Sequence, residues 1–338
     1  MKKIWLVVLC FLLLNGPLSA QSRKRIAIIG GGASGVGAAM FLSKSSFDVD
    51  VYEARDKFGG NARSVRVRPP HRGYEVTVDF GPLVFPNQWE LYLQVLKHFG
   101  IYKNDFNYFN ASIAVWKEGS YDRPSFVTPD ISPSYLEYVA TNEKAITDLI
   151  KVLTTLQSAY IDFKNKRVPA DLSIGDWFKT VSTNPKLIQE VILPIFTSFH
   201  TAPVNKISEF SILPIMKTTT FRSPLSFEPL FTSKSGLGTY LNLIINEVIK
   251  AHRNIRPHLA TAVVDIRRTS DGKWAVLTDK NPTPENFDYI IMANQPINAK
   301  EILKGDEFIS LNKILNQLNY HKTKVVLHTD QYFALKNH

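Results

Sequence analysis

Residues 26–35 read Ile-Ala-Ile-Ile-Gly-Gly-Gly-Ala-Ser-Gly, and residues 49–53 read Val-Asp-Val-Tyr-Glu. The β-branched run before the glycines predicts a strand, the residues after them predict a helix, and the second stretch predicts another strand. In the spacing G-x-G-x-x-G, Gly30 permits a tight turn, Gly32 lets the backbone approach a pyrophosphate, and Gly35 lets the helix pack on the strand. The two stretches therefore predict a Rossmann-type βαβ unit that binds a dinucleotide.

An acidic residue ends the second predicted strand where a dinucleotide ribose would bind. Glu53 comes 18 residues after Gly35, and a carboxylate at this place accepts hydrogen bonds from ribose hydroxyls. The same charge would repel a 2′-phosphate, which disfavours NADP. A glycine turn without a ligand is the structural alternative, but the strand, the helix and the acid together favour a binding site.

The residues from Glu53 to Gly60 read Glu-Ala-Arg-Asp-Lys-Phe-Gly-Gly. They resemble the E-A-x-x-R-x-G-G-R signature of flavin amine oxidases, phytoene desaturases and their relatives, in which the glycine pair approaches the phosphates of FAD. Lys57 and Asn61 stand where the family usually has arginine, so Lys57 keeps the charge but loses the two-pronged hydrogen bonding. The glycine pair favours FAD over NAD, and a NAD-dependent dehydrogenase is the alternative.

Segments far downstream resemble other parts of the same superfamily. Residues 235–238, before a helical pattern at 240–250, resemble the turn that leads back into the FAD domain. Residues 255–266 resemble a strand whose valine touches adenine, and residues 287–296 resemble a buried parallel strand. Asp271-Gly272 predicts a hairpin turn between 264–268 and 274–278. The resemblance covers about residues 24–333 and implies these FAD-binding residues: Gly30, Gly32, Ala33, Ser34, Gly35, Glu53, Ala54, Lys57, Gly59, Gly60, Asn61, Gly81 (in the D-x-G turn 79–81), Val263 and Ala293.

The expected fold class is α/β, a Rossmann-like FAD/NAD(P)-binding domain with an inserted mixed α+β substrate (cap) domain. Apolar residues at helical spacing from 146 to 160 and the segment 173–178 predict helices in the cap, and the segment 187–199 is strongly apolar. Residues 78–85, 193–203 and 325–330 look like a bacterial amine-oxidase-like branch that has no settled substrate. The expected boundaries are a signal peptide at 1–20, an FAD-binding domain at 21–110 and 225–310, and a cap at 111–224 and 311–338.

The candidate catalytic residues are Lys300, His328 and His200. In this chemistry the flavin accepts the hydride, and the protein orients the substrate and tunes a group near flavin N5. Lys300 lies close to the offset at which some amine oxidases hold a water with a lysine, His328 lies on a predicted strand at 324–329, and His200 lies in a candidate pocket with Phe196, Phe199 and Thr201. A surface lysine, structural histidines and ordinary core aromatics are the simpler interpretations. The histidine spacing contains no metal motif, so no metal is predicted.

The N-terminus predicts export. Two lysines precede an apolar run at 4–14, which Asn15-Gly-Pro17 ends; this pattern is typical of a signal peptide, with a retained anchor as the alternative. The processed chain, periplasmic or secreted, would have no cysteine and no stable membrane span. The net charge is +10, and the arginines between 63 and 72 suit either a solvated loop or an anionic surface. No nucleic-acid fold signature is present, a small-molecule substrate is expected, and the oligomeric state is open.

The resemblance also concerns the C-terminus. Family members continue past the predicted strand at 324–329 with a second glycine-acid motif that closes over the flavin, and residues 330–338 do not resemble it. The leading hypothesis is an FAD-dependent oxidoreductase of the amine-oxidase type, which transfers a hydride from an unknown substrate to flavin. A C–N bond of an amine is the default substrate, and a C–C desaturation is possible. The alternative is a truncated, non-catalytic FAD- or ADP-binding protein.

Overall fold

The chain divides into two compact units in a computed structural model. Unit 1 comprises Met1–Arg63 and Leu237–Leu318, and unit 2 comprises Ser64–Gly236 and Asn319–His338. The domain boundaries expected at 110, 224 and 310 differ from this division, and the assignment of 64–110 to cofactor binding stays a prediction. The structure describes residues 22–70, 72–82, 85–86, 89–101, 105–109, 114–115, 126–127, 171–181, 185–200, 202–213, 230–322 and 324–327, and single positions between 147 and 169. The predicted signal peptide at 1–20 lies outside them, so its presence and export stay predictions.

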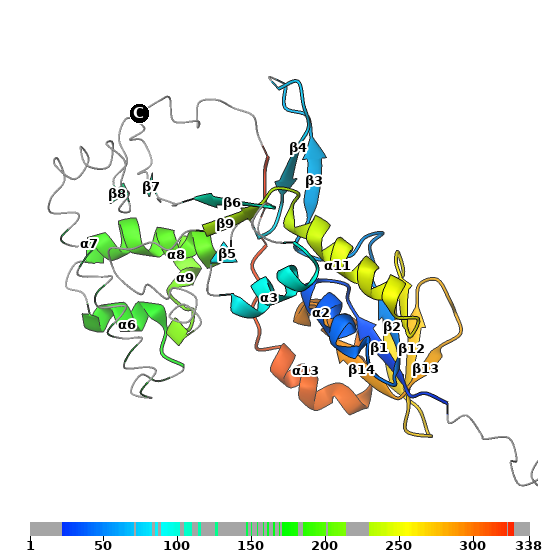
Figure 1. The fold of residues 1–338 in the computed structure, drawn as a ribbon. Coiled ribbons are helices and arrows are strands. Elements are labelled where there is room, and N and C mark those ends of the chain that lie inside the picture. Colours follow the sequence, from blue (N-terminus) through cyan, green and yellow to red (C-terminus); the bar gives the residue numbers. More distant parts are fainter. Residues whose placement is uncertain are drawn as a thin grey trace, which may run out of the picture. The chain divides into compact units, whose positions relative to one another are not determined.

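Unit 1 is built on a four-stranded parallel sheet in the order β10-β2-β1-β14, of which β2, β1 and β14 are labelled in Figure 1. Helix α2 (Ala33–Leu42) connects β1 to β2, which confirms the predicted βαβ unit. Among the described strands β14 forms an edge of the sheet, and its residues are exposed or half-buried. The expectation of a fully buried strand is therefore wrong. The strands are β1 (Arg25–Ile29), β2 (Asp48–Tyr52), β10 (Ile255–His258) and β14 (Tyr289–Met292).

Helices cover one face of this sheet. The side chain of Ile28 points to α2, since a β-carbon at Gly35 would lie 3.5 Å from its Cγ2 atom. Helix α11 (Leu237–Ala251) packs against α2 and β10 (Figure 1). Its buried residues recur at helical spacing and include Leu237, Leu241, Ile244 and Val248, as the apolar pattern at 240–250 predicts.

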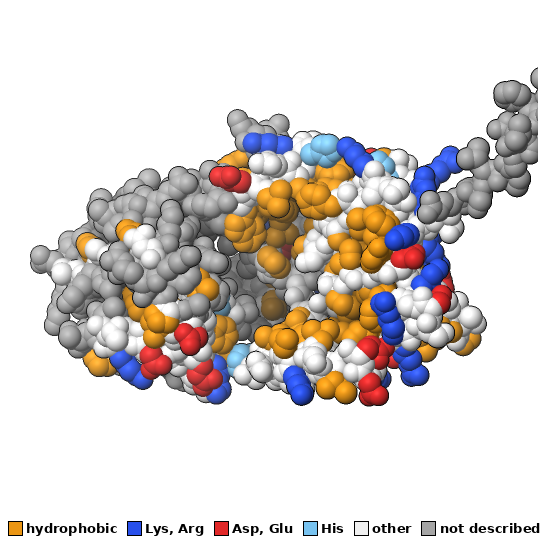
Figure 2. Space-filling model, turned by 90° about the horizontal axis from the view of Figure 1, so that it is seen from below, with side chains coloured by type: hydrophobic (Ala, Val, Ile, Leu, Met, Phe, Trp, Pro, Cys, Tyr) orange, Lys and Arg blue, Asp and Glu red, His pale blue; other side chains and the backbone are white. Residues whose placement is uncertain are grey.

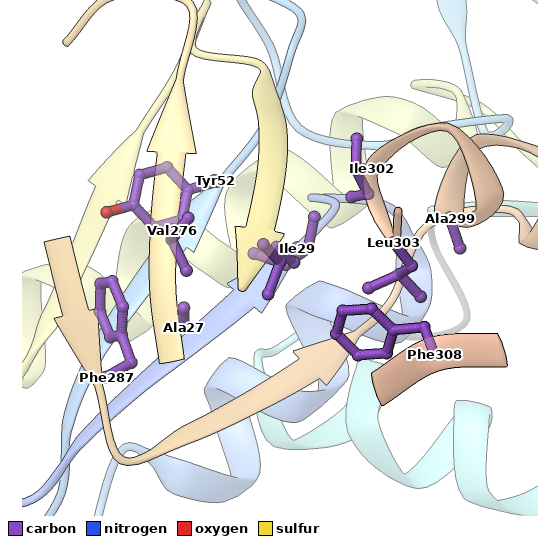
Figure 3. Packing of buried hydrophobic residues seen from close by; sticks show 10 residues of the cluster. Ala27, Ile29, Tyr52, Val276, Phe287, Ala299, Ile302, Leu303 and Phe308 are labelled. Carbon is purple, nitrogen blue, oxygen red and sulfur yellow. The ribbon is translucent and has the colours of Figure 1, made fainter. Parts of the chain in front are cut away.

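A three-stranded antiparallel sheet covers the other face. It consists of β11 (Val263–Arg268), β12 (Trp274–Thr278) and β13 (Glu285–Phe287). Figure 3 shows how Tyr52 of the parallel sheet meets Val276 and Phe287 of this sheet. The same core cluster includes residues from α12 (Pro296–Ile302) and from the 3₁₀ turn η2 (Asp306–Phe308). Unit 1 is thus a three-layer arrangement with the parallel sheet in the middle.

The predicted hairpin is confirmed, whereas the prediction of one continuous strand at 255–266 is wrong. Strands β11 and β12 pair antiparallel around Gly272, whose φ of +82° explains the glycine. The strand expected at 255–266 is divided into β10 and β11, because β10 pairs with the parallel sheet whereas β11 pairs with β12. Ala260 between them has a φ of +49°, which turns the chain from one sheet to the other.

Unit 2 contains short strands and helices. Strands β3 (Ser64–Val67) and β4 (Val76–Asp79) form a hairpin, and β5 (Phe85–Pro86), β9 (Leu230–Ser233) and β6 (Phe106–Phe109) form an antiparallel sheet. Strands β7 (Ala114–Val115) and β8 (Phe126–Val127) pair with each other. The helical segments are α3 (Glu90–His98), α6 (Ile174–Val181), α7 (Pro185–Leu187), η1 (Ile188–Ile192), α8 (Leu193–His200) and α9 (Val204–Ile207). The helix predicted from 173–178 is confirmed as α6, the apolar segment 187–199 is helical as well, and most of 146–160 lies outside the described residues.

The last described segments differ from expectation. Helix α13 (Ile309–Leu315) buries none of its residues, and Ile309 and Ile314 are 53% and 61% exposed. Figure 2 shows hydrophobic side chains gathered in groups on one face of the molecule, with Lys and Arg interspersed among Asp and Glu.

The strand predicted at 324–329 is wrong for 324–327, which are exposed and have no strand partner among the described residues. Within the described ranges, no helix has the length and apolar composition needed to cross a membrane.

A buried carboxylate on β2 gathers three cationic or ionisable side chains. Asp50 is 1% exposed and accepts hydrogen bonds from Arg256 at 2.7 and 2.9 Å and from Arg25 at 3.0 Å. Its second oxygen lies 2.8 Å from Nε2 of His258, whose ring stacks on Tyr52. Burial raises the pKa of Asp50, but the hydrogen bonds from His258, Arg256 and Arg25 outweigh burial and hold the pKa well below its ordinary value.

We expect Asp50→Asn to destabilise the protein and to weaken the effect of acid on its stability. A depressed folded-state pKa stabilises the fold above the unfolded pKa of about 4, and this stabilisation is lost as the pH falls through the folded pKa. At pH 7 the substitution should lower the free energy of unfolding by roughly 3 kcal/mol, the lower end for breaking a buried ion pair, because Arg25 and Arg256 are partly exposed. Urea unfolding at pH 7 and below pH 4 measures both effects.

Asp48→Asn is the matched control. It makes the same change on the same strand, where the carboxylate lies 3.8 Å from each of its arginine partners. An ion pair this long and exposed contributes about 1 kcal/mol or less. Equal losses of stability in the two variants would contradict the role assigned to the Asp50 cluster.

Candidate cofactor-binding site

The turn between β1 and α2 requires glycine at two positions for different steric reasons. Gly30 has a φ of +110°, and a β-carbon there would lie 2.9 Å from backbone atoms of Ala293 and Asn294. A β-carbon at Gly35 would lie 1.8 Å from the carbonyl oxygen of Gly30. The first glycine therefore lets the turn touch the residues that follow β14, and the third lets α2 pack on the turn, as the spacing predicts.

The N-terminus of α2 has backbone N–H groups to offer. Gly32 is the N-cap residue, and no side chain caps this end of the helix by a hydrogen bond. Ala33 and Ser34 open the helix and are exposed. The first N–H groups of a helix have no partner within the helix and carry a partial positive charge, which suits a phosphate.

The second glycine pair lies directly against the first turn. The N–H of Gly59 donates to the carbonyl oxygen of Gly31 at 2.9 Å, and Gly59 forms an isolated parallel bridge with Gly32. Gly60 has a φ of +57°, and a β-carbon on it would lie 2.9 Å from the Cα atom of Gly32. The structure thus brings together two glycine turns that the sequence separates, and together they leave backbone uncovered by side chains.

An asparagine that the sequence analysis missed fixes the second turn. Nδ2 of Asn242, on α11, donates to the carbonyl oxygens of Phe58 and Gly238, each at 2.7 Å. The ring of Phe58 is buried, and a β-carbon built on Gly31 would lie only 2.4 Å from its Cδ1 atom. A polar residue beside the apolar stripe of α11 was the signal that could have identified Asn242.

Glu53 is held by two backbone groups. Its Oε2 accepts from the N–H of Gly31 at 2.8 Å, and its Oε1 accepts from the N–H of Arg55 at 2.9 Å. The residue is only 8% exposed. Each carboxylate oxygen has a further lone pair, so the fixed carboxylate can still accept hydrogen bonds from ribose hydroxyls.

The segment before β11 lies beside Glu53. The N–H of Thr261 donates to the carbonyl oxygen of Glu53 at 2.9 Å, and the N–H of Ala260 donates to that of Arg55 at 2.7 Å. Val263 follows as the first residue of β11 and is half-buried. The structure therefore brings Val263 close to the end of β2, and its contact with adenine stays a prediction.

The remaining predicted cofactor residues fall into two groups. Ala54, Lys57 and Asn61 are exposed around the second glycine turn in unit 1, and Ala293 borders Gly30. Gly81 belongs to unit 2, just after β4. All the predicted residues except Gly81 thus lie in one unit and converge on the carboxyl ends of β1, β2 and β14.

The described candidate catalytic residues belong to different units. Lys300 lies on α12 in unit 1 and is half-buried, whereas His200 ends α8 in unit 2. Nε2 of His200 is buried without a hydrogen-bond partner among the described residues, and burial lowers the pKa of its ring. His328, Phe199 as a side chain and Thr201 lie outside what the structure describes. The roles of these residues stay predictions.

The geometry of unit 1 fits the ADP half of a dinucleotide cofactor. Backbone N–H groups at the start of α2 suit the phosphates, the fixed carboxylate of Glu53 suits the ribose, and glycines let the two turns pack closely together. In the described part of the chain, no three His, Cys, Asp or Glu side chains are placed to hold a metal ion.

Comparisons with known proteins agree with this geometry. An L-amino acid oxidase from Cerastes cerastes is 30% identical over 177 residues, which are 52% of this chain and 33% of the relative. An L-amino acid oxidase from Crotalus durissus cumanensis is 23% identical over 295 residues, 85% of this chain and 56% of the relative. The solved structure of putrescine oxidase with putrescine bound has a TM-score of 0.56 at 16% identity, and the match covers 83% of this chain and 60% of that one.

The chain spans between a third and somewhat over half of the length of these two relatives. The likeness to putrescine oxidase shows the fold alone. The family model for flavin containing amine oxidoreductase matches residues 33–338, from the first residue of α2 onward. The cofactor implied by the family is FAD, in agreement with the resemblance of residues 53–60. The chain therefore belongs to the flavin-containing amine oxidoreductases.

Proposed function

We propose that this chain uses FAD to oxidise a carbon–nitrogen bond of a small amine. The observation that carries the proposal is the joint glycine cradle of residues 30–35 and 59–60, with Glu53 locked beside it by two backbone N–H groups. This arrangement matches the demands of the ADP half of FAD at each position. The family to which the chain belongs supplies the reaction type.

The reaction would divide the work between cofactor and protein. When bound, FAD supplies a two-electron acceptor that takes a hydride from the substrate carbon. The amine carbon loses the hydride and its nitrogen loses a proton, which leaves an imine that water can convert to a carbonyl compound and ammonia. The residues of unit 1 hold and orient the cofactor through its phosphates and ribose, and Glu53 fixes its adenosine end.

An amine is favoured over a carbon–carbon desaturation by the names of the similar proteins. Two of them are L-amino acid oxidases, and the third is putrescine oxidase. Both activities concern an amino group on a carbon that carries hydrogen. L-Amino acids and aliphatic diamines are therefore the substrate classes to test first.

A binding-only role is the second candidate. The contacts described in unit 1 all concern the ADP half of the cofactor, and a non-catalytic FAD- or ADP-binding protein needs the same contacts. The two candidates differ only in whether a substrate reduces the bound flavin.

The visible spectrum of the purified chain separates the two. We expect the absorption bands of oxidised flavin, either at once or after addition of FAD, and loss of these bands when an L-amino acid or putrescine is added without oxygen. Lactate, which carries a hydroxyl in place of the amine of alanine, is the matched control and should leave the bands unchanged. Bound flavin that no amine reduces would support the binding-only role, and a protein that takes up neither FAD nor ADP would contradict both candidates.

A further inference from the structure

The backbone of Asn294 lies at the glycine turn. Its side chain takes part in none of the contacts described above. It follows β14 directly, and its backbone nitrogen would lie 2.9 Å from a β-carbon of Gly30. Its Oδ1 atom is buried and has no hydrogen-bond partner among the described residues. A buried acceptor without a donor is costly, so its presence requires a reason.

The strand order places Asn294 at the point where a dinucleotide crosses the sheet. From β1 the chain passes through α2 to β2 on one side, whereas β14 pairs with β1 on the other side. In open parallel sheets, ligands bind in the crevice at this switch point, outside the carboxyl ends of the strands. With its adenosine at Glu53, beyond β2, the cofactor must pass its diphosphate over β1 towards β14.

The chemistry of the side chain matches a diphosphate. An asparagine amide has one acceptor atom and one nitrogen with two N–H donors at opposite ends. Oδ1 is buried whereas the residue as a whole is half-buried, so we infer that Nδ2 is the end of the amide that a ligand in the crevice can reach. Phosphate oxygens accept hydrogen bonds and cannot donate them at neutral pH, so they pair with Nδ2.

We propose that Asn294 is a cofactor-positioning residue whose Nδ2 donates a hydrogen bond to the diphosphate of FAD at the crevice between β1 and β14. The inference rests on the cofactor of the family and is independent of which substrate is oxidised. The buried orphaned oxygen is then the cost of aiming the donor end of the amide at the ligand.

Isothermal titration of the apoprotein with AMP, ADP and FAD tests this role. Asn294→Asp keeps the shape of the side chain but replaces the donor by a negative charge. We expect the dissociation constants of ADP and FAD to rise about tenfold or more. AMP ends one phosphate short of the crevice, so its constant should change less than about twofold. A residue that only supports the fold would weaken all three ligands alike.

The matched control is Asn298→Asp, which makes the same change at an exposed position on α12. It should leave all three affinities unchanged. If Asn294→Asp fails to fold, Asn294→Ser removes the donor without adding charge and should weaken ADP and FAD, again without weakening AMP. Equal losses for AMP, ADP and FAD, unchanged ADP affinity, or a wild-type apoprotein that does not bind ADP would each overturn the proposal.

Discussion

Gly35→Ala is expected to lower the free energy of unfolding by about 3 kcal/mol or more, at the upper end for overpacking, and to abolish FAD binding. The new β-carbon would lie 1.8 Å from the carbonyl oxygen of Gly30 and 3.0 Å from its carbon. Both atoms belong to the backbone of the turn that is predicted to hold the phosphates, so relief of the clash must move either α2 or the turn. Chemical denaturation measures the stability, and quenching of flavin fluorescence measures the binding.

Gly37→Ala supplies the opposite expectation on the same helix. Apart from its chain neighbours and the backbone of its own helix, no atom of the described residues lies within 4 Å of a β-carbon built at Gly37. Because glycine destabilises a helix interior relative to alanine, this substitution should raise the stability by about 0.5–1 kcal/mol and leave FAD binding intact. Equal effects of the two substitutions would show that the close approach at Gly35 is not what requires glycine.

Glu53→Gln is expected to weaken FAD binding by about 100-fold, since a hydrogen bond to a charged group contributes roughly 1.5–3 kcal/mol. The carboxylate accepts from two backbone N–H groups, those of Gly31 and Arg55. An amide supplies one acceptor, so its NH₂ group must face one of these donors. The side chain then turns away from its position, and the ribose loses its acceptor. Titration of the apoprotein with FAD measures the change.

Glu247→Gln controls for loss of a negative charge. Glu247 lies on α11, where it is exposed and pairs with Lys250 at 2.7 Å. An exposed pair of this kind contributes about 0.3–0.5 kcal/mol, so FAD affinity should not change. If Glu53→Gln retains full FAD affinity, the ribose-binding role of Glu53 is wrong.

The local sequence predicts the parts of the site that depend on backbone shape. Gly35 is constrained by sterics within one turn, Gly30 has a positive φ that favours glycine in that turn, and Glu53 follows at the distance that a βαβ unit sets. The glycine pair was recognised by resemblance to the family signature. The structure shows why Gly60 is needed, since a β-carbon there would clash with the Cα atom of Gly32. These positions could be predicted because their neighbours lie close in sequence or at fixed spacing.

The residues that were missed depend on partners far away in the chain. Asp50 reads as an ordinary polar residue in a strand, yet it lies under Arg256 and His258, more than 200 residues later. Asn242 likewise reaches Phe58 across 184 positions. Local periodicity contains no information on such pairs. For the same reason the break between β10 and β11 was missed, because it is set by which sheet each segment joins.

The insertion of unit 2 into unit 1 has a consequence for synthesis on the ribosome. Strand β1 pairs with β14, as in the pair Ile26 and Tyr289. At bacterial or eukaryotic elongation rates, β1 therefore waits on the order of 10–50 seconds before its second neighbour is made. Over this interval one edge of an almost entirely apolar strand is free to pair wrongly. The yield of folded protein should therefore depend more on chaperones that shield strand edges than on the stability of the finished fold.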